Sequence, residues 1–384
     1  MGATIRRITI LGCYNAMATT LFGPMDIFNQ AGRLWNRLGK LPQTPFFDVV
    51  IASVDGKPIR CLNDVLVQPH CSIDAVESTD LIIIASTTYI DKILETGPGL
   101  VPWIRHQYAR GAHVASVCTG VFLLAETGLL DGRSATLHWG FADMFRKRYP
   151  RVNVNVDRMF IDQGRLYCAA GANAGMDLSL YLVEKFCGRQ TAIQCAKTMI
   201  LDMGRERQTP YGAFLLTRSH GDPVVTSVQE WMEAHHTETI DYDRLAKKHR
   251  ISRRSLERRF KQASGLTPLG YLQQLRVDSA KRLLEDGRYT VAEITDLVGY
   301  ADISFFRKVF VKLTGLQPRA YQQRFGGYAD AGAAMHRDSS GLDSGDRFGP
   351  CCHVIRSTRL RVPPDKDIRL HQTSWGFCFA SHCR

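Results

Sequence analysis

One stretch of the chain occurs twice, as Leu256-Glu-Arg-Arg-Phe-Lys-Gln-Ala-Ser-Gly-Leu-Thr-Pro-Leu-Gly-Tyr271 and, fifty residues later, as Phe306-Arg-Lys-Val-Phe-Val-Lys-Leu-Thr-Gly-Leu-Gln-Pro-Arg-Ala-Tyr321. Two large apolar residues four apart, a Gly-Leu pair, a proline and a tyrosine recur at the same places. Self-similarity at a fixed offset indicates one supersecondary unit used twice, and two copies are too few for a solenoid, which needs about three. The sequence therefore predicts two small helical modules.

The first copy has the pattern of a helix-turn-helix. Leu245 belongs to the supporting helix, Ser252 caps the next helix, and Leu256 and Phe260 face inward four residues apart. The outer face of that next helix then carries Ser252, Arg253, Arg254, Arg258 and Lys261. A small bundle does not need such a row of arginines to fold, whereas a helix in the major groove uses them for base edges and phosphates. The alternative interpretation is a solvated basic face.

The second copy repeats this arrangement with fewer charges. Thr290 and Glu293 form a capping box for the supporting helix, and the second helix runs from about Asp302 to Lys312. Its outer face carries Asp302, Ser304, Arg307 and Lys308. Because the arginine row is denser in the first copy, we expect the first helix to supply more sequence discrimination and the second more anchoring.

A continuous helical pattern from Pro268 to Glu285 joins the two copies. Its length, about 27 Å at 1.5 Å per residue, suits two recognition helices spaced about one turn of DNA, roughly 34 Å. The region Trp231 to Phe325 resembles the AraC/XylS-type DNA-binding domain, including the string from Val298 to Phe310. This resemblance implies a bacterial transcription regulator that binds double-stranded promoter DNA in successive major grooves.

Composition limits the remaining possibilities. The 384 residues are 45% apolar, enough for two or three domains, and the net charge of +12 is densest in residues 226–326, with 18 Lys and Arg against 12 Asp and Glu. No apolar run approaches the roughly 20 residues of a membrane helix. Eleven cysteines without a C-x-x-C pair or a zinc-type cluster indicate a reducing cytoplasm and no metal site.

Short apolar runs alternate with helical patterns over residues 5–190, which predicts an α/β doubly wound domain of flavodoxin-like type with a mostly parallel sheet. The expected strands are Arg7–Leu11, Phe47–Ser53, Leu81–Ala85 and His113–Val117. The expected helices are Gly23–Leu38, Tyr89–Thr96, Leu100–Ala109, Thr119–Thr127 and Ala174–Cys187, with a hairpin at Asp157–Cys168.

Cys118 stands where a buried strand runs directly into a helix, with Gly120 allowing close packing. Such an elbow exposes a side chain at the carboxyl edge of the sheet, and the helix N-terminus favours a thiolate. The alternative is a small buried cysteine with no chemistry.

The same region resembles the PfpI-type, class I glutamine amidotransferase-like superfamily. The resemblance implies that Cys118 meets an acidic residue matching Asp26 and a histidine matching His138. Two departures argue against enzyme chemistry: Thr119 replaces the histidine that follows the cysteine in peptidase-type members, and Ser86-Thr87-Thr88 replaces the glycines that supply an oxyanion donor. A pocket of Asp26, Thr87, Cys118, Thr119 and His138 could still bind a small polar molecule; for His138, a structural role is the alternative to a base.

The domain order resembles the GlxA group of regulators, which implies a small nitrogen-containing effector. We expect a ligand-sensing and dimerisation domain at 1–204, a linker at 205–222, a DNA-binding domain at 223–326 and a disordered tail at 327–384. The leading function is an effector-controlled transcription regulator, an activator by expectation, which acts as a homodimer with RNA polymerase as a partner and without a cofactor or membrane. The rival is a cysteine-dependent hydrolase or hydratase that uses Cys118.

Overall fold

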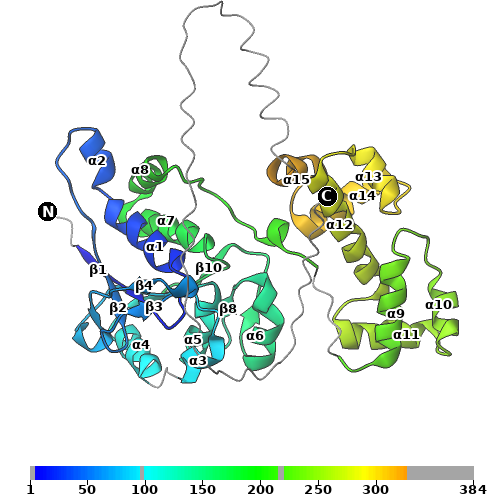
Figure 1. Ribbon diagram of the computed structural model, residues 1–384, viewed down its shortest axis with the longest axis horizontal. Helices are drawn as coiled ribbons and strands as arrows, with labels where there is room; N and C mark the ends of the chain where they lie inside the picture. The colour runs from blue at the N-terminus through cyan, green and yellow to red at the C-terminus, as the bar shows by residue number, and fades with distance from the viewer. Residues whose placement is uncertain (1–4, 96–98, 215–219, 327–384) are drawn as a thin grey trace, which may run out of the picture. The chain divides into compact units, whose positions relative to one another are not determined.

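The computed structural model describes residues 5–95, 99–214 and 220–326, and shows an α/β domain followed by an all-helical domain (Figure 1). This is the predicted fold class. The tail prediction for 327–384 lies outside the described residues. No helix in the described part of the chain combines the length and the apolar character that crossing a membrane would require.

A seven-stranded sheet forms the centre of the α/β domain. Its strands, in spatial order, are β10 (Phe160–Asp162), β11 (Leu166–Ala169), β7 (His113–Val117), β6 (Leu81–Ile84), β1 (Arg6–Leu11), β2 (Phe47–Ser53) and β5 (Cys71–Ser72). Within this sheet, the β10–β11 pair alone is antiparallel, and it forms the predicted hairpin. From β1 the chain first moves to β2 and β5, and then returns to the other side of β1 to form β6. The strand order therefore reverses between β1 and β6, the place where open α/β sheets bind ligands.

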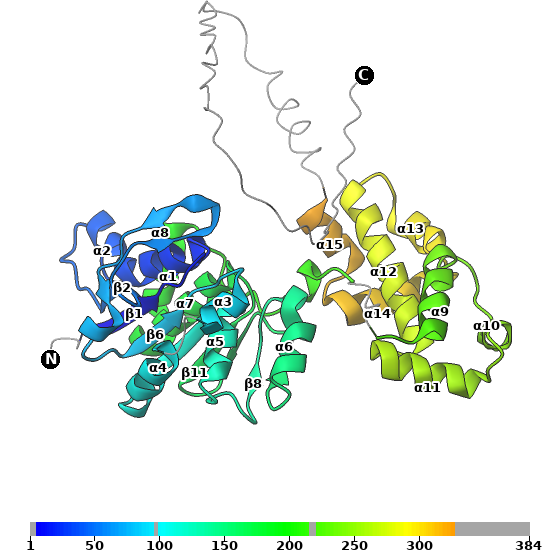
Figure 2. The same ribbon diagram turned by 60° about the horizontal axis from the view of Figure 1, so that its bottom comes forward.

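Helices cover both faces of the sheet (Figure 2). One face packs against α1 (Thr19–Gln30), α7 (Ala174–Cys187) and α8 (Arg189–Met199), and the short helix α2 (Leu34–Leu38) lies against α8. The other packs against α3 (Ile90–Glu95), α4 (Leu100–Ala109), α5 (Val121–Glu126) and α6 (Ala142–Arg148). Alternation along β1 explains the two cores, because Ile8 and Ile10 join the first cluster and Leu11 joins the second.

Short elements complete this domain. They are β3 (Ile59–Arg60) with β4 (Leu66–Val67), β8 (Ser134–Ala135) with β9 (Asn153–Val154), and the 3-10 turns η1 (Leu62–Asp64), η2 (Ile73–Ala75), η3 (Cys118–Gly120), η4 (Trp139–Phe141) and η5 (Thr209–Tyr211). The predicted helix Gly23–Leu38 was wrong at its start and in its continuity. The helix begins at Thr19, because Thr20 and Leu21 are buried, and it ends before Gly32, whose φ of 73° no helix accommodates.

The helical domain contains seven helices in the described residues. They are α9 (Pro223–Ala234), α10 (Tyr242–Lys248), α11 (Arg253–Ser264), α12 (Pro268–Asp286), α13 (Val291–Leu297), α14 (Ile303–Thr314) and α15 (Pro318–Phe325). Two separate apolar clusters hold them, one around Phe260 and Tyr271 and one around Phe306 and Phe310. The first half of α12 packs in one cluster and the second half in the other, so the two predicted modules share this helix.

Capping residues mark the ends of the helices in both helix-turn-helix units. The Ser252 hydroxyl accepts a hydrogen bond from the Ser255 backbone N–H at the start of α11, and the predicted capping box at Thr290 is formed. Gly265 and Gly315 end α11 and α14 with φ of 76° and 77°, a conformation that favours glycine.

The segment predicted as a linker is partly fixed. Thr209 and Pro210 form the turn η5, and the Gln208 side chain is 4% exposed. The turn-forming residues indicated a loop correctly, but a buried, hydrogen-bonded glutamine holds that loop in place. Residues 215–219 of the predicted linker lie outside the described residues.

Candidate functional site

The elbow at the end of β7 has a strained backbone. Cys118 has a φ of 55°, in the left-handed region, and its side chain is 8% exposed. Such a conformation costs a non-glycine residue roughly 1–2 kcal/mol. A Cβ atom on Gly120 would lie 2.5 Å from the Ile84 carbonyl oxygen and 2.8 Å from that of Ala85. The elbow therefore packs directly on the carboxyl end of β6, beside the reversal point of the sheet.

The Thr119 hydroxyl fastens the loop after β6 to this elbow. It donates to the Thr87 carbonyl oxygen at 2.5 Å, accepts from the Thr87 backbone N–H at 3.0 Å, and lies 2.9 Å from the Ser86 hydroxyl. All three residues are buried. The structure thus brings together Thr87, Thr119 and Cys118, as the sequence predicted, and adds Ser86.

Thr20, and not Asp26, reaches the site from α1. The buried Thr20 hydroxyl accepts a hydrogen bond from the Ser86 backbone N–H at 3.0 Å. Asp26 lies exposed on the same helix, and no hydrogen bond or ion pair joins it to Cys118 within the described residues. Six residues are about one and two-thirds helical turns, so the two side chains point in different directions. A prediction that began α1 at Thr19 would have placed Thr20 in its first turn, beside the loop after β6.

The environment of Cys118 favours the neutral thiol. Burial raises the pKa of Cys118, and hydrogen bonds from the Ser86 side chain and from the Thr119 and His138 backbones offset this only in part. No carboxylate contributes to this balance. A thiol with a raised pKa is a weak nucleophile at neutral pH, because the thiolate is the reactive form.

Residues of its own loop hold the His138 ring. Its ring stacks on Trp139 with centroids 5.0 Å apart, and its Nδ1 accepts from the Gly140 backbone N–H at 3.2 Å. Burial lowers the pKa of His138, which favours the neutral imidazole. Across the described ranges, no hydrogen bond joins the His138 ring to Cys118. The ring is therefore placed as a lining or structural group more than as a base.

The chemistry available here is polar recognition. The backbone donors of Ser86 and Thr87, which an oxyanion would need, are already bonded to Thr20 and Thr119. No group of His, Cys, Asp and Glu side chains suited to a metal ion is found in the part of the chain that the structure describes. The hydroxyls of Ser86, Thr87 and Thr119 are also buried and hydrogen-bonded within the protein, so the neutral Cys118 thiol and the partly exposed His138 ring are left to contact a small molecule.

A second candidate site is the outer face of α11. Ser252, Arg253, Arg254, Arg258 and Lys261 are all exposed. Arg253 is bonded to Glu257 at 3.0 Å and to Asp243 at 3.3 Å, whereas Arg254, Arg258 and Lys261 have no ion pair with any described residue. Three cations of this face are therefore available for phosphates or bases.

The outer face of α14 differs in detail. Asp302 caps the helix by accepting from the Ser304 and Phe305 backbone N–H groups, so its carboxylate has a structural task. Ser304, Arg307 and Lys308 are exposed, and neither cation is ion-paired among residues 220–326. Phe305, outside the predicted contact set, is 50% exposed beside them.

Comparisons with known proteins match both regions. Residues 6–185 match the DJ-1/PfpI family, and residues 245–324 match a helix-turn-helix domain. The HTH-type transcriptional regulator CdhR of Pseudomonas aeruginosa is 30% identical over 261 residues, which cover 68% of this chain and 77% of that protein. The HTH-type transcriptional regulator GlxA of Rhizobium meliloti is 26% identical over 217 residues, 56% of this chain and 67% of that protein. Isonitrile hydratase of Pseudomonas putida is 28% identical over 153 residues, 40% of this chain and 65% of the enzyme.

Proposed function

We propose that this chain, which belongs to the AraC-type HTH transcriptional regulators with an N-terminal DJ-1/PfpI domain, binds specific promoter DNA under the control of a small metabolite. The observation that carries the proposal is the pair of exposed helix faces on α11 and α14. Their cations Arg254, Arg258, Lys261, Arg307 and Lys308 lack acidic partners among the described residues. Two such faces on one duplicated scaffold suit successive major grooves.

The α/β domain supplies the sensor in this proposal. Its polar groups gather at the reversal point of the sheet, where doubly wound folds bind ligands. Because these groups are uncharged, we propose that the effector is a small polar, nitrogen-containing molecule. Its binding site is formed by Thr87, Cys118, Thr119 and His138. Control of DNA binding requires the effector to bind one conformation more tightly than the other.

We propose a binding role for this domain instead of catalysis. An acyl-transfer enzyme would need an activated thiolate and free oxyanion donors, and here burial raises the pKa of Cys118 while Ser86 and Thr87 use their amides internally. Asp26, the predicted acidic partner, is exposed on α1.

The alternative function is a cysteine-dependent hydratase or hydrolase. The similarity to isonitrile hydratase and the strained Cys118 backbone favour it. The test is Cys118→Ser, with Cys71→Ser as the control at a partly exposed cysteine outside the elbow. If catalysis is not required, we expect the effector to change promoter output in both variants as it does in the unmodified chain, with at most a shift of the effector concentration needed by Cys118→Ser. Turnover of an isonitrile by the unmodified chain, abolished only by Cys118→Ser, would establish the alternative.

Assembly and partners form a further part of the proposal. We propose a homodimer formed through the α/β domain, acting in the bacterial cytoplasm as an activator that contacts RNA polymerase. Light scattering of the full chain tests the dimer, and transcription from a selected promoter with purified polymerase tests activation. A monomer, or transcription reduced by the protein, would refute the corresponding statement.

The main proposal is tested by selecting duplexes from a random library with the full chain. We expect one sequence class with two half-sites about one helical turn apart. Arg254→Ala and Arg307→Ala should weaken binding, while Arg288→Ala is the matched control, because Arg288 is exposed outside both recognition helices and pairs with Asp286. A metabolite screen then measures shifts in affinity for the selected duplex. Enrichment of no sequence would overturn the proposal.

A further inference from the structure

The side chain of Gln208 holds the backbone on both sides of His138. Its Oε1 accepts from the Trp139 backbone N–H at 3.2 Å, and its Nε2 donates to the Leu137 carbonyl oxygen at 2.9 Å and to the Thr136 hydroxyl at 3.1 Å. The Gln208 backbone N–H also donates to the Asp157 carbonyl oxygen at 2.9 Å. One residue of the connecting segment therefore fixes the loop that carries His138.

This clamp is tightly determined. Gln208 is 4% exposed, so its amide has exchanged water for protein partners on each polar atom. Removing a buried hydrogen-bonding partner typically costs about 1–3 kcal/mol for the group left unsatisfied. The His138 backbone is also one of the groups that lower the pKa of the Cys118 thiol. A molecule that displaces the backbone at His138 must therefore also displace Gln208 or break its hydrogen bonds to Leu137 and Trp139.

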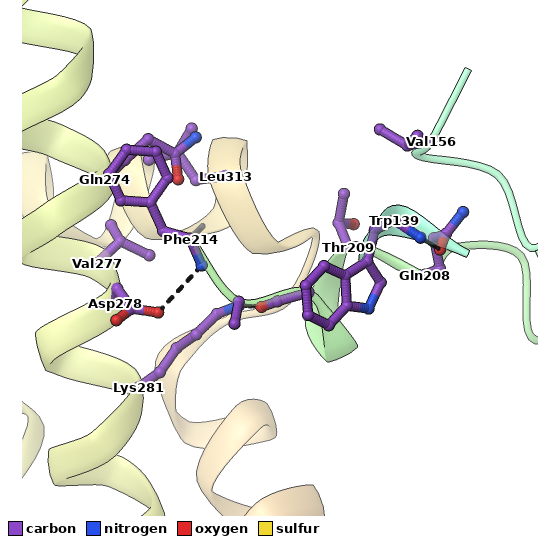
Figure 3. Close-up of a pocket in the computed structure, with 12 residues that line it drawn as sticks. Trp139, Val156, Gln208, Thr209, Phe214, Gln274, Val277, Asp278, Lys281 and Leu313 are labelled. Carbon is purple, nitrogen blue, oxygen red and sulfur yellow. Dashed lines mark hydrogen bonds between the residues drawn. The ribbon is translucent and has the colours of Figure 1, made fainter. Parts of the chain in front are cut away.

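The same segment is fastened to α12 a few residues later. The Lys281 ammonium donates to the Gly212 carbonyl oxygen at 2.6 Å, and the Phe214 backbone N–H donates to Asp278 at 3.4 Å. The Phe214 ring packs against Tyr271 with centroids 5.1 Å apart. Lys281 is 9% exposed, and its ammonium lies 5.6 Å from the centroid of the Tyr321 ring as well as bonding to Gly212, so this buried cation is held between the segment and α15. Figure 3 shows Phe214 bonded to Asp278, with Lys281 nearby, among the residues that line a cavity. The volume of this cavity is about 210 Å³.

The second attachment lies on the helix shared by the two DNA-binding modules. Tyr271 and Leu272 of α12 belong to the first cluster, and Val277, Ala280 and Leu284 to the second. A shift of α12 would therefore change both recognition helices together. Between Gln208 and Gly212 stand only Thr209, Pro210 and Tyr211, which form the turn η5. A proline-containing turn of this length has little freedom to absorb a displacement.

We propose that residues 207–214 form a coupling strap, through which the state of the Cys118–His138 site controls α12, with Gln208 and Lys281 as its two attachment residues. This inference rests on the proposed function, since it assigns the path by which the sensor acts on the DNA-binding domain. The rival interpretation is a passive tether, in which both attachments stabilise the chain without carrying a signal.

The test perturbs the site with His138→Ala and measures backbone hydrogen exchange in the full chain without DNA. We expect this substitution to speed exchange in α12 residues 274–284 by about threefold or more, because the strap transmits the local change. The effect should fall below about 1.5-fold when Gln208→Leu or Lys281→Met is present. Gln190→Leu, the same chemical change at an exposed position on α8, should leave the effect of His138→Ala intact.

Lys281→Met keeps the test decisive if Gln208→Leu destabilises the α/β domain, because it leaves every contact of Gln208 in place. An equal response of α12 to His138→Ala in all four backgrounds would show a passive tether, and so would no response in the unmodified chain. The affinity for a selected duplex is measured in parallel. A coupled exchange response without any selected duplex would retain the strap and reject the proposed function.

Discussion

The two helix-turn-helix units share their caps and differ in what surrounds their recognition helices. Ser252 and Asp302 start α11 and α14, and a left-handed glycine ends each helix. On α11, Arg253 pairs with Asp243 and Glu257, and Arg259 forms two hydrogen bonds with Asp222. On α14, no cation has an acidic partner in the described range 220–326.

The cores show the opposite trend. The second unit packs Tyr300, Phe306, Phe310 and Tyr321 in a continuous series of tilted and edge-to-face rings, with neighbouring centroids 5.6–5.7 Å apart. The first unit has Leu256 where the second has Phe306. The duplicated fold therefore places more of its polar bonding around α11 and more of its apolar packing behind α14. Because Arg253 and Arg259 are paired with carboxylates, we expect Arg254 and Arg258 to carry the sequence discrimination assigned to the first unit.

The largest expected effect is the loss of stability when one of the two apolar clusters loses a buried ring. Phe260→Ala and Phe310→Ala each remove a fully buried ring and should each lower the free energy of unfolding of their own unit by about 3–5 kcal/mol. The loss should be greater for Phe310, which stacks on both Phe306 and Tyr321. Hydrogen exchange in α11 and α14 measures each unit. Equal losses in both units from either substitution would show a single shared core.

Base contacts come next. Arg254→Ala and Arg307→Ala should each weaken specific binding by about 1–3 kcal/mol if the side chains touch bases. Lys261→Ala and Lys308→Ala should weaken binding to all sequences and reduce the salt dependence by about one phosphate contact. Competition binding against point-mutated duplexes measures both effects. A greater change in base preference from Arg307→Ala than from Arg254→Ala would reverse the assigned division of labour.

The caps test the shared part of the design. Ser252→Ala and Asp302→Ala should each destabilise their unit by about 0.5–2 kcal/mol, because the first amides of the helix lose their acceptor. Asp302→Asn retains an acceptor, so it should lower the stability of its unit by only about a few tenths of a kcal/mol. Exchange rates at Ser255 and Ser304 report the effect. Unchanged hydrogen-exchange rates in Asp302→Ala would show that Asp302 does not stabilise α14 and would leave it a role in DNA contact alone.

The smallest effect concerns pH. Hydrogen bonding to Arg259 holds the pKa of Asp222 below its usual range. A depressed folded pKa gives stability that is present above the unfolded value near 3.8 and is lost as the pH falls through the folded value. We expect about 1 kcal/mol or less from this partly exposed pair. Asp222→Asn keeps the cap of α9 and should remove this acid dependence; melts between pH 6 and 3 measure it.

The sequence predicted what depends on local patterns. Periodicity located the repeat, and glycine, serine and threonine marked the helix ends because capping is decided within a few residues. The strands Phe47–Ser53 and His113–Val117 were predicted with their observed bounds, since fully covered strands are continuous apolar runs.

The parts that were missed depend on contacts between distant residues. Choosing Thr20 over Asp26 required the start and rotation of α1, and the bond from Ser86 to Thr20 spans 66 residues. The clamp at Gln208 spans about 70 residues and leaves no periodic signal. The pairing of Arg253 with Asp243 on α10 similarly occupies one arginine of the outer face predicted for α11.

One further consequence follows from α12. Its 19 residues form a continuous helix about 28 Å long, and each end is built into a different module. A spacer of fixed length makes the protein sensitive to phase on the promoter. Five extra base pairs between the half-sites, about half a turn of DNA, would turn the second groove to the far side of the duplex, whereas a full extra turn would restore its facing but not its distance. We expect the protein to bind neither of these longer spacings. The length of α12 therefore fixes the distance between the two half-sites, and a spacing longer by a whole turn of DNA is not equivalent.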